Sequence, residues 1–350
     1  MKSYWTYATA VLLLFSVCLT ACKSVADQLP SPPVSVEQLN IPEDYDYRGM
    51  SWLPNGQLVF WTQQEYRPTI WYLVQGEDQW HELSLAEDPS CDNPFFYGFR
   101  LLPDGRIGII KVCDSVHKDD HTFLIAYNFK TGKQAQVVAS PLKDLSGQFT
   151  WNPQMTLGIQ EKGTGLNDTF YWITPDGIAP MNITIRQGRR SFSLIENYQE
   201  IKANIDAGIV WSPAWSPDGR LIAFFANLDA IGVMGLDRLG GRWNLFLMDP
   251  EELKPYSVLE IYEPTVLYWS PDSRWLAFRA QAGSQHTDGI WLYSQASGKL
   301  YLVAQGSFAN LDWSPDGLKI AAIHCPDISC KDQTQLSIYD VSRIVNKSGQ

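Results

Sequence analysis

The five residues WSPDG at 215–219 recur as WSPDS at 269–273 and as WSPDG at 313–317. Looser copies are WLPNG at 52–56, LLPDG at 101–105 and WNPQM at 151–155. In Ser-Pro-Asp-Gly, proline presets the first central dihedral angle of a turn, aspartate bonds backbone amides and glycine takes the left-handed conformation. Each copy therefore predicts a tight hairpin turn, least clearly at 151–155, where Gln154 and Met155 replace Asp and Gly.

Short apolar runs of the kind that form buried strands follow these turns, as in LIAFFA (221–226) and WLAFRA (275–280). A second strand-like run comes later in each repeat, for example NLFLMD (244–249) and IWLYS (290–294). The six turn prolines are 49, 50, 64, 54 and 44 residues apart, which suits a four-stranded propeller blade with variable loops. The sequence therefore predicts an all-β chain that forms a six-bladed β-propeller over residues 34–345, followed by a tail at 346–350.

The last repeat lacks a fourth strand, because only ten polar and mixed residues follow Asp340. The segment VSVEQLNI (34–41) begins the folded body and belongs to no repeat of its own. We therefore expect this N-terminal strand to complete the sixth blade and close the ring. Closure of this kind removes an open sheet edge, which would otherwise invite aggregation.

The pattern W-S-P-D-G-x-x-I-A-F, followed by an I/L-Y-x-x-D strand, resembles the repeat of TolB-type propellers, which also occurs in the non-catalytic propeller of prolyl oligopeptidase relatives. The resemblance covers nearly all of the chain after residue 33 and is strongest in the last three repeats. It implies the fold more than the function, because one fold hosts many functions. There is no G-x-S-x-G motif of the kind that carries a hydrolase nucleophile, so the peptidase activity is not implied.

The N-terminus combines Lys2 with an apolar run at 8–19, which is short for a membrane span. A basic start, a short apolar centre and a small-residue cleavage site are typical of a secretory signal. The residues LTAC at 19–22 also resemble the lipobox of bacterial lipoproteins, which implies cleavage before Cys22 and lipid on its thiol. The alternatives are an uncleaved anchor, or an ordinary signal followed by a chance cysteine.

These features predict a signal peptide at 1–21 and a flexible, proline-containing tether at 22–33. The protein is then exported and anchored by lipid to the cell membrane or the outer membrane, with the propeller outside the cytoplasm. The resemblance mildly favours the outer membrane, since Lys23 rather than Asp follows the cysteine. A net charge of −11 repels phosphate backbones, so we expect no nucleic acid partner.

Four cysteines remain beyond the signal and the lipid site: Cys91, Cys113, Cys325 and Cys330. An even number in an exported chain favours disulfides, and four cysteines allow three connectivities. The hairpin at Pro103 brings Cys91 and Cys113 to one side, while Cys325 and Cys330 share a short loop. The pairs 91–113 and 325–330 are therefore favoured, and a thiol or metal role is the alternative.

Four of the five histidines lie in loops that join second and third strands, and these loops emerge on one face of a propeller. The residues of that candidate ligand face are His117, Asp119, Asp120, His121, His286 and His324. Imidazoles and carboxylates are metal ligands, yet polar residues also collect in solvated surface loops. We expect the four histidines not to converge, because intervening blades separate them, and only His117 and His121 to meet easily.

The sequence favours a non-enzymatic protein, a membrane-tethered module of the cell envelope that binds or scaffolds other envelope proteins. It assigns no catalytic residue, metal or cofactor. The alternatives are a metal-dependent hydrolase or lactonase, and a sensor of a small molecule or carbohydrate. Two insertions stand out: 187–208 could form a short helix or a flap over the channel, and 227–241 is an apolar, Gly-rich loop of the kind that marks protein contacts. The alternative for both is an ordinary insertion folded down on the propeller.

Overall fold

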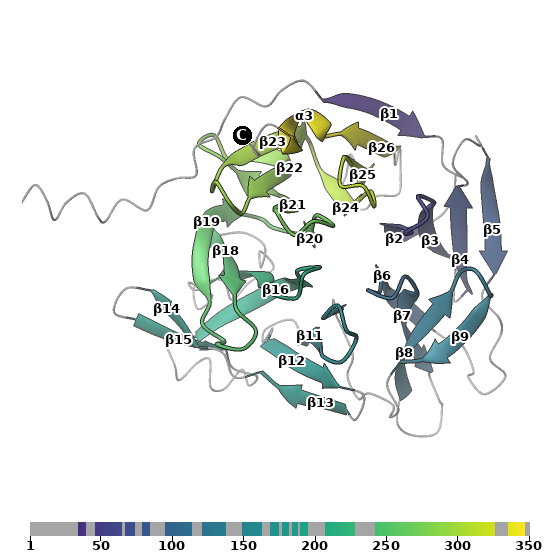
Figure 1. Ribbon diagram of the computed structural model, residues 1–350, viewed down its shortest axis with the longest axis horizontal. Coiled ribbons are helices and arrows are strands. Elements are labelled where there is room, and N and C mark those ends of the chain that lie inside the picture. Colours follow the sequence, from purple (N-terminus) through teal and green to yellow (C-terminus); the bar gives the residue numbers. More distant parts are fainter. Residues whose placement is uncertain are drawn as a thin grey trace, which may run out of the picture.

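Strands make up most of the described residues and surround a common centre, with β2, β6, β16 and β20 nearest to it (Figure 1). This computed structural model describes residues 34–39, 46–64, 67–73, 79–84, 95–113, 121–137, 149–162, 169–174, 177–181, 184–187, 190–194, 207–227, 242–325 and 335–346. The arrangement is all-β and propeller-like. The predicted signal peptide, the tether with Cys22 and the residues after 346 lie outside the described residues.

Four sheets of four strands each occur among the described residues. The first contains β2 (Asp46–Trp52), β3 (Leu58–Gln64), β4 (Arg67–Leu73) and β5 (Trp80–Ser84). The second contains β6 (Phe95–Leu101), β7 (Ile107–Cys113), β8 (His121–Asn128) and β9 (Lys133–Gln136). The third contains β10 (Phe149–Trp151), β11 (Gly158–Lys162), β12 (Thr169–Thr174) and β13 (Gly177–Pro180). The last contains β24 (Phe308–Trp313), β25 (Lys319–His324), β26 (Gln335–Asp340) and β1 (Ser35–Leu39), with α3 (Ser342–Val345) after it.

A ten-stranded sheet lies between the third and the last of these sheets in the chain. Its first part contains β14 (Thr184–Gln187), β15 (Arg190–Leu194), β16 (Ala207–Trp215), β17 (Ile222–Asn227), β18 (Arg242–Met248) and β19 (Tyr256–Tyr262). Its second part contains β20 (Leu267–Trp269), β21 (Trp275–Ala282), β22 (Thr287–Ser294) and β23 (Leu300–Gln305). Only the pair Tyr262 and Gln281 joins β19 to β21, so the sheet divides naturally at that point.

The first and last strands of the described chain pair with each other. Strand β1 runs antiparallel to β26, from Ser35 opposite Asp340 to Leu39 opposite Leu336. The sequence predicts this neighbour for the N-terminal strand, and the pairing is therefore confirmed. The strand is mostly exposed, with Val36 at 51% exposure, and therefore contributes more to the hydrogen-bonded edge than to the core.

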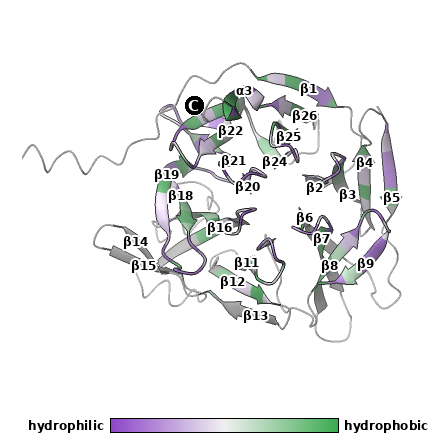
Figure 2. Cartoon of the chain, viewed as in Figure 1, coloured by the Kyte–Doolittle hydropathy of each residue, from purple (hydrophilic) through white to green (hydrophobic). Residues whose placement is uncertain are grey.

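Buried apolar side chains form six clusters within the described residues; five lie between neighbouring sheets, and the sixth, which contains Phe225 and Phe278, lies between the two parts of the ten-stranded sheet. Phe170 meets Phe224 between the third sheet and β17, with ring centres 5.3 Å apart. Another cluster joins Phe60 of β3 to Ile338 of β26, so the first and last sheets also share a core. Figure 2 shows the complementary pattern, with hydrophilic residues on the turns that surround the centre.

The six predicted turns share one geometry. In each, the residue two positions after the proline donates its N–H to the carbonyl of the residue before the proline, at 2.9 Å. That donor has a positive φ in every copy, including Met155 at 57° and Ser273 at 59°. The turn at 151–155 therefore forms without Asp or Gly, because Asn152 Oδ1 accepts the amides of Thr156 and Leu157 instead.

The aspartates of the Ser-Pro-Asp turns fasten these hairpins. Ser216 Oγ donates to Asp218 at 2.6 Å, and the amide of Arg220 donates to the same carboxylate at 3.1 Å. Burial alone would raise the pKa of Asp218, but these bonds and the charge of Arg220 hold it below its ordinary value. The same serine–aspartate bond recurs at 270 and 272 and at 314 and 316.

Where the insertion at 187–208 is described, it forms strands that pair with the sheet, as an insertion folded down on the propeller would. Residues 184–187 and 190–194 form the hairpin β14–β15, and β15 continues the sheet by parallel pairing of Ser193 and Leu194 with the start of β16. Residues 195–206 and most of the 227–241 loop lie outside the described residues. A search of the described residues for a helix long and apolar enough to cross a membrane finds none.

Candidate binding site at the centre

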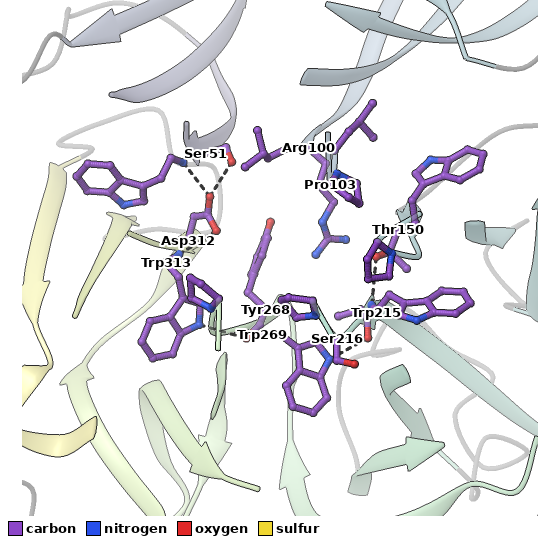
Figure 3. Close-up of a pocket in the computed structure, with 18 of the residues that line it drawn as sticks. Ser51, Arg100, Pro103, Thr150, Trp215, Ser216, Tyr268, Trp269, Asp312 and Trp313 are labelled. Carbon is purple, nitrogen blue, oxygen red and sulfur yellow. Dashed lines mark hydrogen bonds between the residues drawn. The ribbon is translucent and has the colours of Figure 1, made fainter. Parts of the chain in front are cut away.

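The third residue before each turn proline lies on the wall of one central cavity of about 420 Å³ (Figure 3). These residues occupy the same position in β2, β6, β10, β16, β20 and β24, so each repeat contributes one side chain. They are Ser51, Arg100, Thr150, Ala214, Tyr268 and Asp312. The turn prolines line the same cavity, which therefore has an apolar rim and a mixed polar wall.

Arg100 reaches across the cavity and connects four of the innermost strands. Its guanidinium donates to the carbonyl oxygens of Phe149 at 3.1 Å, Pro213 at 3.5 Å and Leu267 at 3.2 Å. The same group lies 4.6 Å from the ring centre of Tyr268, a cation–π distance. These contacts fix a positive charge at the centre of the molecule.

Asp312 connects the last sheet to the first. Its carboxylate accepts from Ser51 Oγ at 2.7 Å, from the Trp52 amide at 2.9 Å and from the Trp313 amide at 2.8 Å. Desolvation raises the pKa of Asp312 to about 6, although these three bonds and the charge of Arg100 oppose the rise. A carboxyl group with a strongly displaced pKa in a cavity is a recognised mark of a functional site.

Tyr268 and Thr150 complete the polar wall. The Tyr268 hydroxyl donates to Asn310 Oδ1 at 3.4 Å. Burial raises the pKa of Tyr268, while Arg100 lowers it and Asp312 raises it by smaller amounts, so the phenol stays neutral near pH 7. Thr150 Oγ1 accepts the Trp215 amide at 3.1 Å, which leaves the hydroxyl hydrogen to point elsewhere.

Tryptophans that follow these wall residues pack between neighbouring sheets. The indole of Trp269 donates to the carbonyl of Ala214 at 3.0 Å, and that of Trp313 donates to the carbonyl of Tyr268 at 3.3 Å. Each of these indoles therefore bonds to the wall residue of the preceding repeat. The geometry of the wall is set by contacts between repeats as well as within them.

No family model matches the chain, and no curated protein matches it. Several solved structures match it. TolB from Acinetobacter baumannii matches with a TM-score of 0.50 and 14% identity, over 84% of this chain and 63% of that one. This chain has a TolB-like β-propeller fold. An oligogalacturonate lyase from Vibrio parahaemolyticus (TM-score 0.50, 11% identity) covers 91% of this chain and is itself covered to 99%. The PQQ-bound aldose sugar dehydrogenase from Streptomyces coelicolor (TM-score 0.52, 14% identity) covers 89% and is covered to 99%.

At these identities the likeness defines the fold, and the differing activities of the three neighbours leave function to the site itself. The TolB-like resemblance stated from the repeats is confirmed at the level of the fold. The chain spans less than two thirds of the TolB structure's own length.

Of the predicted histidines, the described His286 and His324 do not line the central cavity. His117, Asp119 and Asp120 lie outside the described residues, and His121 is described only as the first residue of β8. His286 lies in the exposed turn after β21 and stacks on Tyr262 at 4.4 Å, whereas His324 ends β25 and meets Phe308 edge-on at 5.3 Å. Among the described residues no three His, Cys, Asp or Glu side chains are grouped as a metal site. The metal-dependent hydrolase therefore stays a hypothesis.

The predicted disulfides are described only in part. Cys325 is buried and disulfide-bonded. Cys91 and Cys330 lie outside the described residues, and Cys113 is described only as the last residue of β7. The pairs 91–113 and 325–330 therefore remain predictions.

The central wall was not predicted from the sequence, although the repeat contains its signal. The position three before the proline reads Ser, Arg, Thr, Ala, Tyr and Asp in the six copies, while the next position is Trp in five and Leu in one. Five of the six residues at the variable position carry a polar or charged group, beside a nearly constant aromatic residue, so this position does not serve packing alone.

Proposed function

We propose that this TolB-like propeller is a tethered binding protein of the cell envelope that holds part of a partner protein at its central cavity. One observation carries the proposal, the cavity wall to which all six repeats contribute. Charged groups inside a protein are costly unless they are bonded. Arg100 and Asp312 nevertheless occupy equivalent positions at the centre, where packing alone would favour small or apolar side chains.

Recognition suits this wall better than proton transfer does. The Asp312 carboxylate already accepts three hydrogen bonds, and Arg100 is held by three carbonyl groups. Groups fixed in this way present a constant pattern of charge to a guest, as a binding site requires. A cavity with an apolar rim and a few fixed polar groups is the usual form of such a site.

The proposal includes a closed ring of six blades over residues 34–345. The division of the ten-stranded sheet at Tyr262 and Gln281 separates the four strands β20–β23 from a unit in which the hairpin β14–β15 adds to the four strands β16–β19, and this supports six blades in total. Closure is supported by the pairing of β1 with β26, by the cluster that contains Phe60 and Ile338, and by the bonds from Ser51 and Trp52 to Asp312.

The proposal also includes export and a lipid anchor on Cys22, for which the LTAC sequence after an apolar run is the support. A tether over 22–33 could hold the propeller up to roughly 35–40 Å from a bilayer. The pairs 91–113 and 325–330 would then form outside the cytoplasm, where disulfides persist.

The test is capture of partners from native membranes by the full acylated protein, with the mouth of the cavity narrowed. The variants Pro103→Trp and Pro217→Trp enlarge exposed turn residues on the rim, at a turn position that accepts most residue types. Ala296→Trp, in an exposed turn that does not line the cavity, is the matched control. We expect the rim variants to lose the captured partner and the control to keep it. Equal capture by all three would refute the proposed site.

A small-molecule sensor is the second candidate, because a cavity of about 420 Å³ falls within the range of small-ligand pockets. Mass spectrometry of protein purified under native conditions separates the two candidates. A stoichiometric small molecule that is lost in Pro103→Trp would favour the sensor.

A further inference from the structure

The donors and acceptors on the cavity wall are unequally used within the described part of the chain. Asp312 accepts three bonds, so its acceptor capacity is largely filled. Arg100 makes three bonds out of five N–H donors. Thr150 accepts the Trp215 amide and keeps a hydroxyl hydrogen to donate. The donors left for a guest therefore belong to Arg100 and Thr150, whereas the negatively charged acceptor of the wall, Asp312, is largely occupied.

We propose that the guest presents a carboxylate to Arg100 and Thr150 and an apolar group to the turn prolines of the rim. The inference rests on the proposed function and deepens it by naming the chemistry that the cavity recognises. A guanidinium bonds a carboxylate through two parallel N–H groups, which gives direction as well as charge. A small free carboxylate and a carboxylate carried by a protein partner share this chemistry.

Asp312 makes this recognition depend on pH. At neutral pH its negative charge balances Arg100 and opposes an incoming anion. Among the described side chains, the charged and titratable groups that act on Asp312 are Arg100 of β6 and Tyr268 of β20, while Ser51 and Trp52 of β2, which are uncharged, donate hydrogen bonds to its carboxylate. Because Tyr268 stays neutral, Asp312 is the group whose charge changes near pH 6, and its protonation leaves the cavity cationic.

Calorimetric titration of the full chain with matched probes tests the proposal. The first set is phenylacetate, phenylacetamide and phenethylamine, which share a shape and differ in charge. The second set is a pentapeptide ending in phenylalanine, with a free or an amidated end. We expect each carboxylate to bind more tightly than its amide at both pH values. The ratio of the two affinities should be about tenfold larger at pH 5.5 than at pH 7.5, because Asp312 loses most of its bound proton between these values while the guest stays ionised. Tight binding of phenylacetate points to a small carboxylate, and preference for the peptide points to a partner's chain end.

Single substitutions test which wall residues produce the carboxylate preference and its pH dependence. Thr150→Val should weaken carboxylate binding, and Thr150→Ser should restore it. Asp312→Asn should make the affinity independent of pH, and Arg100→Lys should reduce the preference of carboxylate over amide. The control is Arg106→Gln, because Arg106 belongs to the same sheet but pairs with Asp104 outside the cavity. Melting curves identify any variant that fails to fold, and the probe pairs on the unaltered chain remain decisive in that case.

Two results would overturn the inference: no preference for any carboxylate over its amide, or a preference that survives in Thr150→Val and Arg100→Lys alike. If the carboxylate inference fails but the rim variants still abolish partner capture, the proposed function stands without the carboxylate site. If carboxylates bind but partner capture ignores the rim, the proposed function fails and the carboxylate site remains.

Discussion

In three of the turns, the glycine lies against the proline of the preceding turn. A Cβ atom on Gly219 would lie 3.3 Å from Pro153 Cδ, and one on Gly105 would lie 3.3 Å from Pro54 Cγ. The third case is Gly317, whose nearest atom would be Pro271 Cδ at 3.6 Å. Glycine therefore serves both the positive φ of its own turn and the close packing of neighbouring turns around the centre.

Gly219→Ala is expected to lower the free energy of unfolding by about 2 kcal/mol, since alanine is strained at positive φ and meets Pro153. Gly132→Ala is the control, because Gly132 also has a positive φ but its nearest neighbour is Tyr127 Oη at 3.8 Å. Denaturant unfolding of both variants checks the prediction. An equal loss in both would show that crowding between turns contributes nothing.

Asp312 should give stability a distinctive dependence on pH. Its pKa of about 6 in the folded protein exceeds the ordinary 3.8, so the folded state binds the proton more tightly and loses this stabilisation as pH rises through 6. The free energy of unfolding of the unaltered chain should therefore fall between pH 4 and pH 7 by roughly 2 kcal/mol more than that of Asp312→Asn, because one pKa unit corresponds to about 1.4 kcal/mol. Parallel profiles for the two proteins would contradict this account.

Local chemistry explains which residues were predictable. The turns follow from proline and glycine within five residues, and even Met155 and Ser273 take the same conformation because the surrounding hydrogen bonds require it. The central wall does not follow in this way. Arg100 takes its partners from β10, β16 and β20, contacts that no local stretch of sequence specifies.

At the scale of elements, the repeats predicted the hairpins, and the missing fourth strand of the last repeat predicted the pairing of the N-terminal strand. For the insertion at 187–208 the sequence left open a short helix, a flap or a segment folded down on the propeller. In its described part β15 pairs with β16, so an available strand edge decided the conformation. Insertions between repeats have no repeat pattern to guide them.

Removal of residues 34–41 is the element-scale prediction. Loss of β1 exposes the edge of β26 and removes its ladder bonds, so we expect a loss of about 2–5 kcal/mol in the free energy of unfolding of the whole propeller. Deletion of residues 23–33, which leaves β1 in place, should leave stability unchanged. Calorimetric melting of both deletion variants tests this prediction. An unaltered melting transition in the variant without β1 would show that the strand is dispensable.

At the scale of the molecule, the proposed anchor on Cys22 would decide where the propeller works. Cys22→Ser should release the protein from the membrane fraction or leave it unprocessed, because the thiol proposed to carry the lipid is removed. Fractionation and mass spectrometry of the N-terminus measure both outcomes. Continued processing and membrane retention without acylation would contradict the anchor.

The pairing of β1 with β26 also sets the order in which the chain can fold. Strand β1 is synthesised long before β26, the strand with which it pairs. Until β26 has been made, β1 is an unpaired edge, and contacts so distant in sequence form slowly. A chain that still lacks β26 is therefore open to mispairing, so factors that shield emerging segments will matter more for this protein than for one in which every strand pairs with a near neighbour in the sequence.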